Sequence, residues 1–191
     1  YFESDRMNQY RMLRAIKNRF GPVGEAAFFE MNRGGLGALA GPVTDVHDDA
    51  APGRVYTAIL EGSRSLGVEV QSLVTRSPYG PARRMAEGLD NSRLVLIAAV
   101  LEKYLKVRLA ECDIFANLAG GLDAEDPALD LALCAAILSS YKESELIRMA
   151  CIGEVGLSGE VRPVSRLEER AAELARLGFR RILVPAGARV H

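Results

Sequence analysis

The sequence has few of the residues that hold metal ions or form disulfides. Its 191 residues include three cysteines and two histidines. Cys112, Cys134 and Cys151 form no C-x-x-C pair, and His47 and His191 lie far apart in the sequence. An odd number of isolated cysteines argues against a disulfide framework and a zinc site, and it is typical of a reducing cytosol. We therefore expect no metal site in this chain and a cytoplasmic location.

Long apolar runs and a charge excess are also absent. No apolar run approaches the roughly 20 residues that span a bilayer, and no signal peptide opens the chain, so we expect no membrane partner. The formal net charge of -1 gives no overall attraction to nucleic acid, and any such contact has to come from local basic clusters. The first residue is Tyr1 rather than Met, which suggests a fragment of a longer protein.

The apolar fraction is high enough for a substantial core, since 49% of the residues are hydrophobic. The length suits one domain and an extension. Beyond Pro52, the periodicity predicts a single α/β domain, in which helices pack on a mixed sheet. Strands are expected at 54–61, 67–75, 114–118 and 181–184, a hairpin at 152–164, and helices from Asp90 to Leu105, at 128–139 and at 165–177.

The first part of the chain has a different character. Asp5 is suited to cap a helix that runs to about Asn18, and residues 25–31 predict a buried strand. Residues 32–53 are rich in Gly, Pro and Asp, which is typical of a linker. We place the domain boundary near Pro52, with a first segment at 1–31, a linker at 32–51 and a domain at 52–191.

Two segments of the expected domain resemble the proteolytic domain of the Lon protease family. They are Gly120–Asp130, and Gly153–Pro163 with the helix that opens at Ser165. That family has a nucleophilic Ser just after an Asp-Gly-Pro turn, and a Lys base on the helix after a Gly-Glu hairpin. Here these positions are Ala128 and Glu168. A methyl group cannot attack a carbonyl, and a carboxylate base has no nucleophile to activate. The resemblance therefore implies a Lon-like fold without peptidase activity.

The residues themselves offer a structural explanation of both positions. Asp126 suits a helix N-cap, and Pro127 and Ala128 suit a first helical turn. Ser165 and Glu168 have the spacing of a capping box. Cys134 lies on an apolar helix and is expected to be a core thiol rather than a nucleophile. Three further hydroxyls lie in the wrong local setting for a nucleophile, those of Ser139, Ser140 and Ser158.

The motif Lys17-Asn18-Arg19-Phe20-Gly21 forms the second candidate site. Two cations beside a glycine at a helix end could clamp a phosphate or complement the helix dipole, and the residues alone leave both open. The same five residues are the signature of the RadA/Sms DNA repair family. Further segments resemble that family, at 1–6, 9–14, 83–93, 101–103 and 153–163, so the resemblance covers nearly the whole chain.

The resemblance implies a place for this chain in a longer protein. RadA/Sms proteins have an N-terminal zinc finger, a RecA-like ATPase with a phosphate-binding loop, and a C-terminal Lon-like domain. Residues 1–31 would be the end of the ATPase, and 52–191 the Lon-like domain. The sequence has no G-x-x-x-x-G-K-[ST] loop, so we expect no cofactor and no ATP hydrolysis in this part alone. The full-length parent would use ATP, Mg²⁺ and Zn²⁺.

In that family the five-residue motif acts across a subunit interface. Lys17 and Arg19 would reach the ATP of a neighbouring subunit, as an arginine finger does, and would matter only in a hexameric ring. The implied function is that of a DNA-dependent ATPase and helicase, a hydrolase that acts in recombinational repair and branch migration. The expected partners are single-stranded or branched DNA, further copies of the chain, and a RecA-type recombinase.

Arginines are the candidate DNA contacts, because cationic side chains bind phosphates without reading sequence. Each could equally be a solvated surface charge or half of an ion pair. They form two groups, Arg76, Arg83, Arg84 and Arg93 in the first, and Arg180 and Arg181 in the second. Two alternatives stay open: a pure oligomerisation domain without DNA contact, and a Lon-type peptidase that uses another residue.

Overall fold

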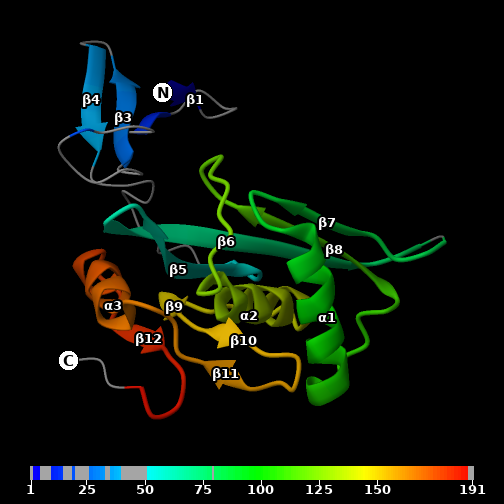
Figure 1. Cartoon of the computed structure of the whole chain (residues 1–191). Helices are drawn as coiled ribbons and strands as arrows, with labels where there is room; N and C mark the ends of the chain where they lie inside the picture. The colour runs from blue at the N-terminus through cyan, green and yellow to red at the C-terminus, as the bar shows by residue number, and fades with distance from the viewer. Residues whose placement is uncertain are drawn as a thin grey trace.

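The computed structural model describes residues 2–4, 10–14, 19, 26–32, 35–39, 51–78 and 80–188. Within these residues the strands form a four-stranded sheet, a six-stranded sheet and a two-stranded hairpin (Figure 1). Three helices accompany the six-stranded sheet. The prediction of an α/β fold with a mixed sheet and packed helices is therefore confirmed.

The small sheet near the start of the chain is antiparallel throughout. Its strands follow the sequence order, β1 (Phe2–Ser4), β2 (Tyr10–Arg14), β3 (Ala26–Asn32) and β4 (Gly35–Leu39). The strand predicted at 25–31 is thus confirmed as β3. Strand β4 lies inside the segment predicted as a linker and pairs with β3, so regular structure extends into that segment.

The helix predicted from Asp5 to Asn18 is wrong over Tyr10–Arg14, which form strand β2. This short segment has apolar residues that fit the helical period and the strand period alike, and local pattern does not separate the two. Hydrogen-bonded pairing makes this segment a strand, because every residue of β2 is in register with a residue of β3. Residues 5–9 and 15–18, where the rest of that helix was expected, lie outside the described residues.

The six-stranded sheet is the centre of the larger domain. It consists of β5 (Arg54–Glu61), β6 (Arg64–Arg76), β7 (Arg84–Glu87), β8 (Cys112–Leu118), β9 (Met149–Cys151) and β12 (Arg181–Leu183). The order across the sheet is β12-β9-β5-β6-β8-β7. The two central pairings, β5 with β6 and β6 with β8, are antiparallel, and the three others are parallel. Strands β7 and β12 are therefore the two edges.

Helices cover both faces of this sheet. Along β5, Val55 and Ile59 belong to the apolar cluster that includes helices α1 (Asn91–Leu105) and α2 (Leu129–Tyr141). Tyr56 and Ala58 belong to a second cluster with helix α3 (Leu167–Arg176). Successive strand side chains point to opposite faces, so α2 and α3 lie on opposite faces near β5. The hairpin of β10 (Glu154–Val155) and β11 (Val161–Arg162) packs against α2 through β10.

The helix signals in the sequence were partly right. Asp90 caps α1 as predicted, because its Oδ1 accepts a hydrogen bond from the Ser92 amide at 2.9 Å. The capping box predicted for Ser165 and Glu168 is wrong: the N-cap of α3 is Arg166, in a left-handed conformation and with no side-chain cap. The Arg166 guanidinium instead binds Glu169 and the carbonyl of Ser63, which fixes the start of the helix by a longer-range contact.

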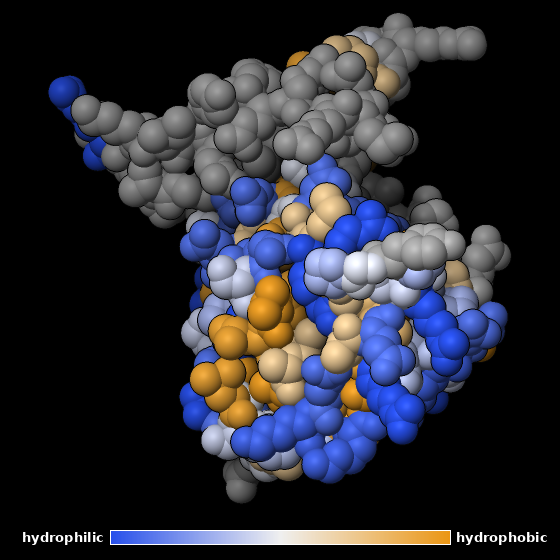
Figure 2. All heavy atoms as spheres, turned by 90° about the vertical axis from the view of Figure 1, so that its right-hand side faces the viewer, coloured by the Kyte–Doolittle hydropathy of each residue, from blue (hydrophilic) through white to orange (hydrophobic). Residues whose placement is uncertain are grey.

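One side of the larger domain exposes apolar side chains. Helix α1 forms this side, and Figure 2 shows apolar surface gathered on it. The exposed apolar residues of α1 are Val95, Leu96, Tyr104 and Leu105. Contiguous exposed apolar surface on a folded domain indicates a contact with another molecule.

Candidate functional site

The position at which the Lon resemblance would place a nucleophile is buried. Ala128 lies directly before α2 and has no exposed surface. Its methyl group belongs to the apolar cluster around Tyr56, Ile152 and Leu174. Its amide donates to Asp126 Oδ1 at 3.0 Å in the turn before the helix, but the N-cap of α2 is Ala128, without a side-chain cap, and not Asp126 as predicted. A substrate therefore has no access to the side chain at position 128.

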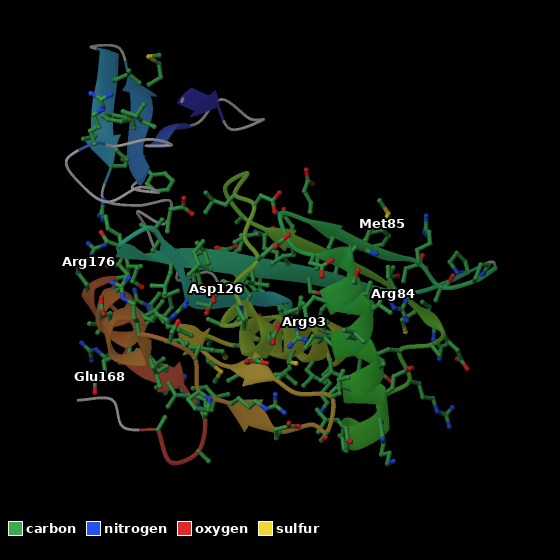
Figure 3. All side chains as sticks on the ribbon, viewed as in Figure 1. Arg84, Met85, Arg93, Asp126, Glu168 and Arg176 are labelled. Atoms are coloured by element: carbon green, nitrogen blue, oxygen red, sulfur yellow. The ribbon has the colours of Figure 1, made fainter. Side chains whose placement is uncertain are left out.

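The position at which the Lon resemblance would place a base, Glu168, lies on another part of the domain surface. Glu168 is exposed in the first turn of α3, and its label in Figure 3 lies on the outer side of that helix, away from Asp126. Among the described residues, the Glu168 side chain has no hydrogen bond or ion pair. The structure thus does not bring Ala128 and Glu168 together, and it assigns neither a catalytic environment.

A buried ion pair occupies the region between α3 and the start of α2. Arg170 is 2% exposed, and its Nη1 donates to Asp126 Oδ2 at 2.7 Å and to the carbonyl of Ala58 at 2.6 Å. Its Nε donates to the carbonyl of Ser165 at 2.9 Å. Asp126 Oδ2 also accepts the amide of Leu60 at 2.9 Å. We call Asp126 and Arg170 the latch, because they join β5, the turn before α2 and α3.

Sequence reasoning missed Arg170. The signal was present, because Leu167, Ala171 and Leu174 mark the inward face of α3 and Arg170 lies on the same face. A charged residue on an apolar helix face is rarely buried unless it is paired. A buried Arg170 is therefore expected to pair with a carboxylate, and its partner in the structure is Asp126.

A second ion pair lies where α1, the first turn of α2 and β10 meet. Arg93 Nε donates to Asp130 Oδ1 at 2.7 Å, and its Nη2 donates to the carbonyl of Val155 at 2.7 Å. The amide of Val155 donates to Asp130 Oδ2 at 2.9 Å. The hydrogen bond to Asp130 raises the pKa of Arg93, although burial opposes this. Arg93, predicted as a DNA contact, therefore ties α1 to α2 and β10.

Arg83 and Arg84 are also engaged within the protein. Arg83 Nε and Nη2 donate to Asp113 Oδ2 at 3.0 and 2.6 Å, and its guanidinium lies 5.5 Å from the centre of the Phe115 ring. Arg84 donates to the carbonyls of Leu109 and Cys112. Arg83 is thus neutralised by a carboxylate, whereas Arg84 is held by neutral acceptors and has no ion-pair partner in the described part of the chain.

The six predicted arginines do not form one cluster. Arg76 is exposed at the end of β6, near the edge that β7 forms. Arg180 and Arg181 are exposed at β12, the opposite edge, where Arg181 makes one long hydrogen bond to the carbonyl of Ile147. Figure 3 shows Arg84 and Arg93 on different elements, β7 and α1. The DNA-contact prediction stays a prediction for all six.

The Arg83–Asp113 pair leads to a test of pH dependence. Hydrogen bonds from Arg83 hold the pKa of Asp113 below its ordinary value. A depressed folded-state pKa adds stability above the unfolded pKa of about 3.9, and that stability is lost as the pH falls through the folded pKa. We expect the difference in unfolding free energy between wild type and Asp113→Asn to be largest at neutral pH and to shrink below about pH 4. Urea titrations across that range measure it, and a pH-independent difference would contradict the assignment.

The hydroxyls and thiols near α2 serve the fold. Ser139 Oγ accepts the amide of Gly53 at 2.8 Å, and Ser140 Oγ accepts the amide of Val74 at 2.9 Å. Burial raises the pKa of both Cys134 and Cys151 to about 12. A protonated, buried thiol is not a nucleophile, so neither cysteine is a candidate catalytic nucleophile.

Thiol labelling tests the burial directly. Cys112, Cys134 and Cys151 are all buried, and burial raises the pKa of each thiol. We expect iodoacetamide near pH 8 to leave all three unmodified in the folded protein and to label all three in urea. Intact-mass spectrometry reads the number of adducts. Rapid labelling of Cys134 in the folded protein would show that α2 is more accessible than described.

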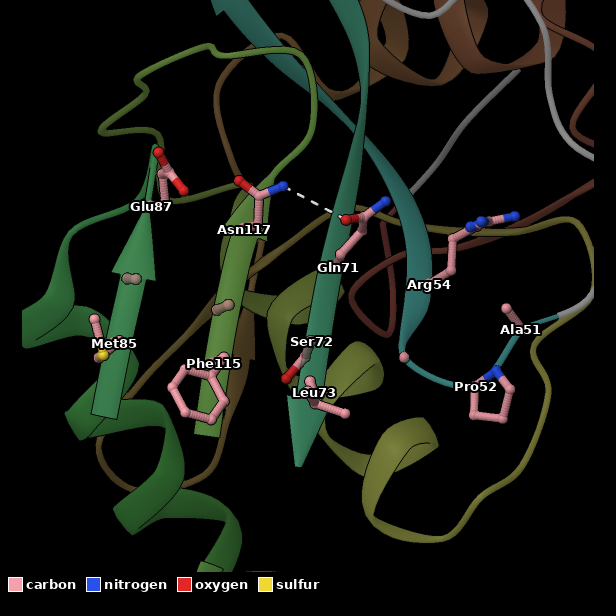
Figure 4. A pocket seen from close by; sticks show the side chains of 13 residues that line it. Ala51, Pro52, Arg54, Gln71, Ser72, Leu73, Met85, Glu87, Phe115 and Asn117 are labelled. Atoms are coloured by element: carbon pink, nitrogen blue, oxygen red, sulfur yellow. Dashed lines mark hydrogen bonds between the residues drawn. The ribbon is translucent and has the colours of Figure 1, made fainter. Parts of the chain in front are cut away.

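The face of β6, β8 and β7 that α2 does not cover carries a hollow of about 450 Å³. Figure 4 shows its lining, and the strand register aligns two rows across it. The polar row is Arg54, Gln71, Asn117 and Glu87; the apolar row is Leu73, Phe115 and Met85. Asn117 Nδ2 donates to Gln71 Oε1 at 3.4 Å. This arrangement contains no nucleophile with an adjacent base, so it does not suggest a catalytic centre.

The five-residue motif is only partly described. Arg19 is exposed, and Lys17, Asn18, Phe20 and Gly21 lie outside the described residues. No group of three or more His, Cys, Asp or Glu side chains in the described part of the chain is arranged to hold a metal ion. No described helix is long and apolar enough to cross a membrane.

Comparison with known proteins identifies the family. The chain is 43% identical over 190 residues to the DNA repair protein RadA of Bacillus subtilis (strain 168), and 45% identical over 192 residues to that of Streptococcus pyogenes serotype M1. The RadA of Listeria monocytogenes serovar 1/2a is 43% identical over 189 residues. These alignments cover 97%, 98% and 97% of this chain. The chain belongs to the RadA/Sms DNA repair family.

A family model matches the second half of this RadA-family chain. Residues 90–188, more than half of the chain, match the model of the family described as subunit ChlI of Mg-chelatase, and this part of the chain belongs to that family. The chain spans about two fifths of its RadA relatives, 42% of the Bacillus protein and 41% of the Listeria protein. The family resemblance seen in the sequence is confirmed over nearly the whole chain.

Proposed function

We propose that this chain is the C-terminal part of a RadA/Sms-type DNA-dependent ATPase and helicase, and that its larger domain is a non-proteolytic, Lon-like scaffold with a DNA-binding surface. The observation that carries the proposal is 43–45% identity to DNA repair proteins named RadA across 97–98% of this chain. In the parent, Lys17 and Arg19 would act on the ATP of a neighbouring subunit, and ATP, Mg²⁺ and Zn²⁺ would be bound by segments other than this domain. A RecA-type recombinase is a further proposed partner in recombinational repair and branch migration.

The geometry at α2 supports a scaffold rather than a peptidase. A peptidase needs an exposed nucleophile beside a base, but Ala128 is buried and Glu168 points outward. The latch fills the region between these helices with hydrogen bonds that leave no carboxylate oxygen of Asp126 unpaired. The Lon-like fold would then survive because the latch replaces the catalytic pair as the link between α2 and α3.

The peptidase alternative is tested by restoring the hydroxyl. We expect no turnover of casein or a fluorogenic peptide by the wild type, and none by Ala128→Ser or by Ala128→Ser with Glu168→Lys. The latch and the burial of position 128 would still exclude substrate. Fluorescence release with a Lon protease as positive control measures it. Turnover by the wild type that another substitution abolishes would favour the peptidase.

The exposed apolar side of α1 supports the scaffold part of the proposal. Six copies in a ring need a contact surface on each subunit, and large contiguous apolar patches are rare on monomers. Val95 and Leu96 are 46% and 41% exposed. A contact through α1 would cover them, while Leu183 on β12 would stay outside it.

The alternative of a pure oligomerisation domain differs in one measurable respect, DNA binding. We expect the chain to bind a labelled single-stranded oligonucleotide and to bind it more weakly as salt rises, because phosphate contacts release counterions. Fluorescence anisotropy measures this. An assembled protein that leaves the oligonucleotide free at low salt would favour the pure oligomerisation domain.

A further inference from the structure

A basic hollow lies at the end of β6, and neither residue of the latch is part of its lining. Its volume is about 750 Å³. Three cationic side chains from three separate segments line it: Arg76 at the end of β6, Arg108 in the loop after α1, and Lys142 at the C-cap of α2. Two carboxylates, Glu111 and Glu143, line it as well.

None of the three cations that line the hollow has a carboxylate partner among the described residues. Among the described residues, no acidic side chain is within ion-pair distance of Arg76, Arg108 or Lys142. By contrast, Arg93 and Arg170 are each paired with an aspartate. Like charges that converge without a partner repel one another, and an anion in the hollow would relieve that repulsion.

A fourth positive charge lies beside the hollow. Arg84 donates to the carbonyls of Leu109 and Cys112, and Cys112 is part of the lining. Burial raises the pKa of the Cys112 thiol, while the charges of Arg84 and Arg76 act in the opposite direction. Both guanidinium groups therefore act on the same thiol, as do the carboxylates of Glu111 and Asp113.

We propose that this hollow binds consecutive phosphate groups of a single nucleic-acid strand. The proposal rests on the proposed function, and it moves the phosphate contacts from Arg83 and Arg93, which are internally paired, to Arg76, Arg108 and Lys142. Cations on three exposed segments suit several phosphates along one strand better than a single enclosed anion. They carry no means of reading bases, so the contact is independent of sequence. Glu111 and Glu143 keep the binding weak and reversible.

The test replaces charge with an amide of similar size at matched positions. We expect Arg108→Gln with Lys142→Gln to weaken binding of a labelled single-stranded oligonucleotide about 10-fold at low salt. The salt dependence should become shallower by about 1.4, since each single-strand phosphate contact contributes about 0.7. Glu111→Gln should strengthen binding by about 2-fold, because it removes a repulsive charge. Arg176→Gln, an equal change at an exposed residue of α3 that is not a candidate DNA contact, should alter affinity by less than about 2-fold.

The outcomes separate this inference from the proposed function. If the wild type does not bind the oligonucleotide, the DNA-binding part of the proposed function fails, and this inference fails with it. If the wild type binds and the double variant binds equally well with an unchanged salt dependence, only this inference is overturned.

A free inorganic anion could also occupy the hollow, and calorimetry with pyrophosphate tests this. Tight pyrophosphate binding that the double variant abolishes, with oligonucleotide affinity unchanged, would assign the hollow to a small free anion and overturn the proposal. Circular dichroism checks that the exposed substitutions leave the fold intact.

Discussion

Replacing Arg170 by methionine is expected to lower the free energy of unfolding by about 3–5 kcal/mol, because it leaves the Asp126 carboxylate buried without its partner. The Arg170 side chain is 2% exposed and that of Asp126 is 12% exposed, so water cannot substitute for the guanidinium. The carbonyls of Ala58 and Ser165 would lose a donor in the same variant. Denaturant titration followed by circular dichroism measures the change.

A matched control lies on the same helix. Arg176 pairs with Glu173 over three residues, and its side chain is 52% exposed. Arg176→Met should therefore change stability by less than about 1 kcal/mol. The double variant Asp126→Asn with Arg170→Met should destabilise by less than the sum of the single variants, since the two groups are coupled. Equal effects of Arg170→Met and Arg176→Met would mean that the latch does not hold α3 to α2.

The second large effect is expected at Gly88, between β7 and the cap of α1. Its φ is +71°, and an added Cβ would lie 2.2 Å from the carbonyl oxygen of Leu122 and 3.0 Å from Leu118 Cβ. Backbone cannot move aside as a flexible side chain can. The Gly88 carbonyl also accepts the amide of Ala124, which holds the two segments together. Gly88→Ala should lower the free energy of unfolding by about 3 kcal/mol or more, from strain and overlap together.

A control at Gly178 separates the steric overlap of the added Cβ from the strain of the left-handed backbone conformation. Gly178 ends α3 with φ +92° and has nothing within 4 Å of an added Cβ. Gly178→Ala should destabilise by about 1–2 kcal/mol through left-handed strain alone. Thermal and urea unfolding of both variants give the difference. If the two substitutions have the same effect, the chain at Gly88 does not approach Leu122 as closely as described.

The elements with local signals could be predicted from the sequence. Helix α1 is an example, because Asp90 caps it and Leu94, Ile97, Ala98 and Leu101 are buried at helical spacing. Strand β5 is another, since its alternating residues fill two separate apolar clusters. Strand β2 was mistaken for a helix because its identity depends on pairing with β3, which begins beyond the local window.

The candidate site was less predictable, because the partners of its charged residues are distant in the sequence. Arg83 and Asp113 are 30 residues apart, and Arg93 and Asp130 are 37 residues apart. From sequence alone, these arginines look like free surface cations. The residues at the two positions that the Lon resemblance assigns to a nucleophile and a base, Ala128 and Glu168, could be read from the sequence. The contact between Asp126 and Arg170 became visible only when α3 was placed beside β5.

Sedimentation velocity of the purified chain, with and without single-stranded DNA at low and moderate salt, tests the central proposal of an assembling, DNA-binding scaffold. We expect an assembly of hexameric mass that binds DNA more weakly as salt rises. Leu96→Glu should reduce it to monomers, and Leu183→Glu, at an exposed position on β12, should not. A wild-type monomer that ignores DNA at both salt concentrations would contradict the proposal.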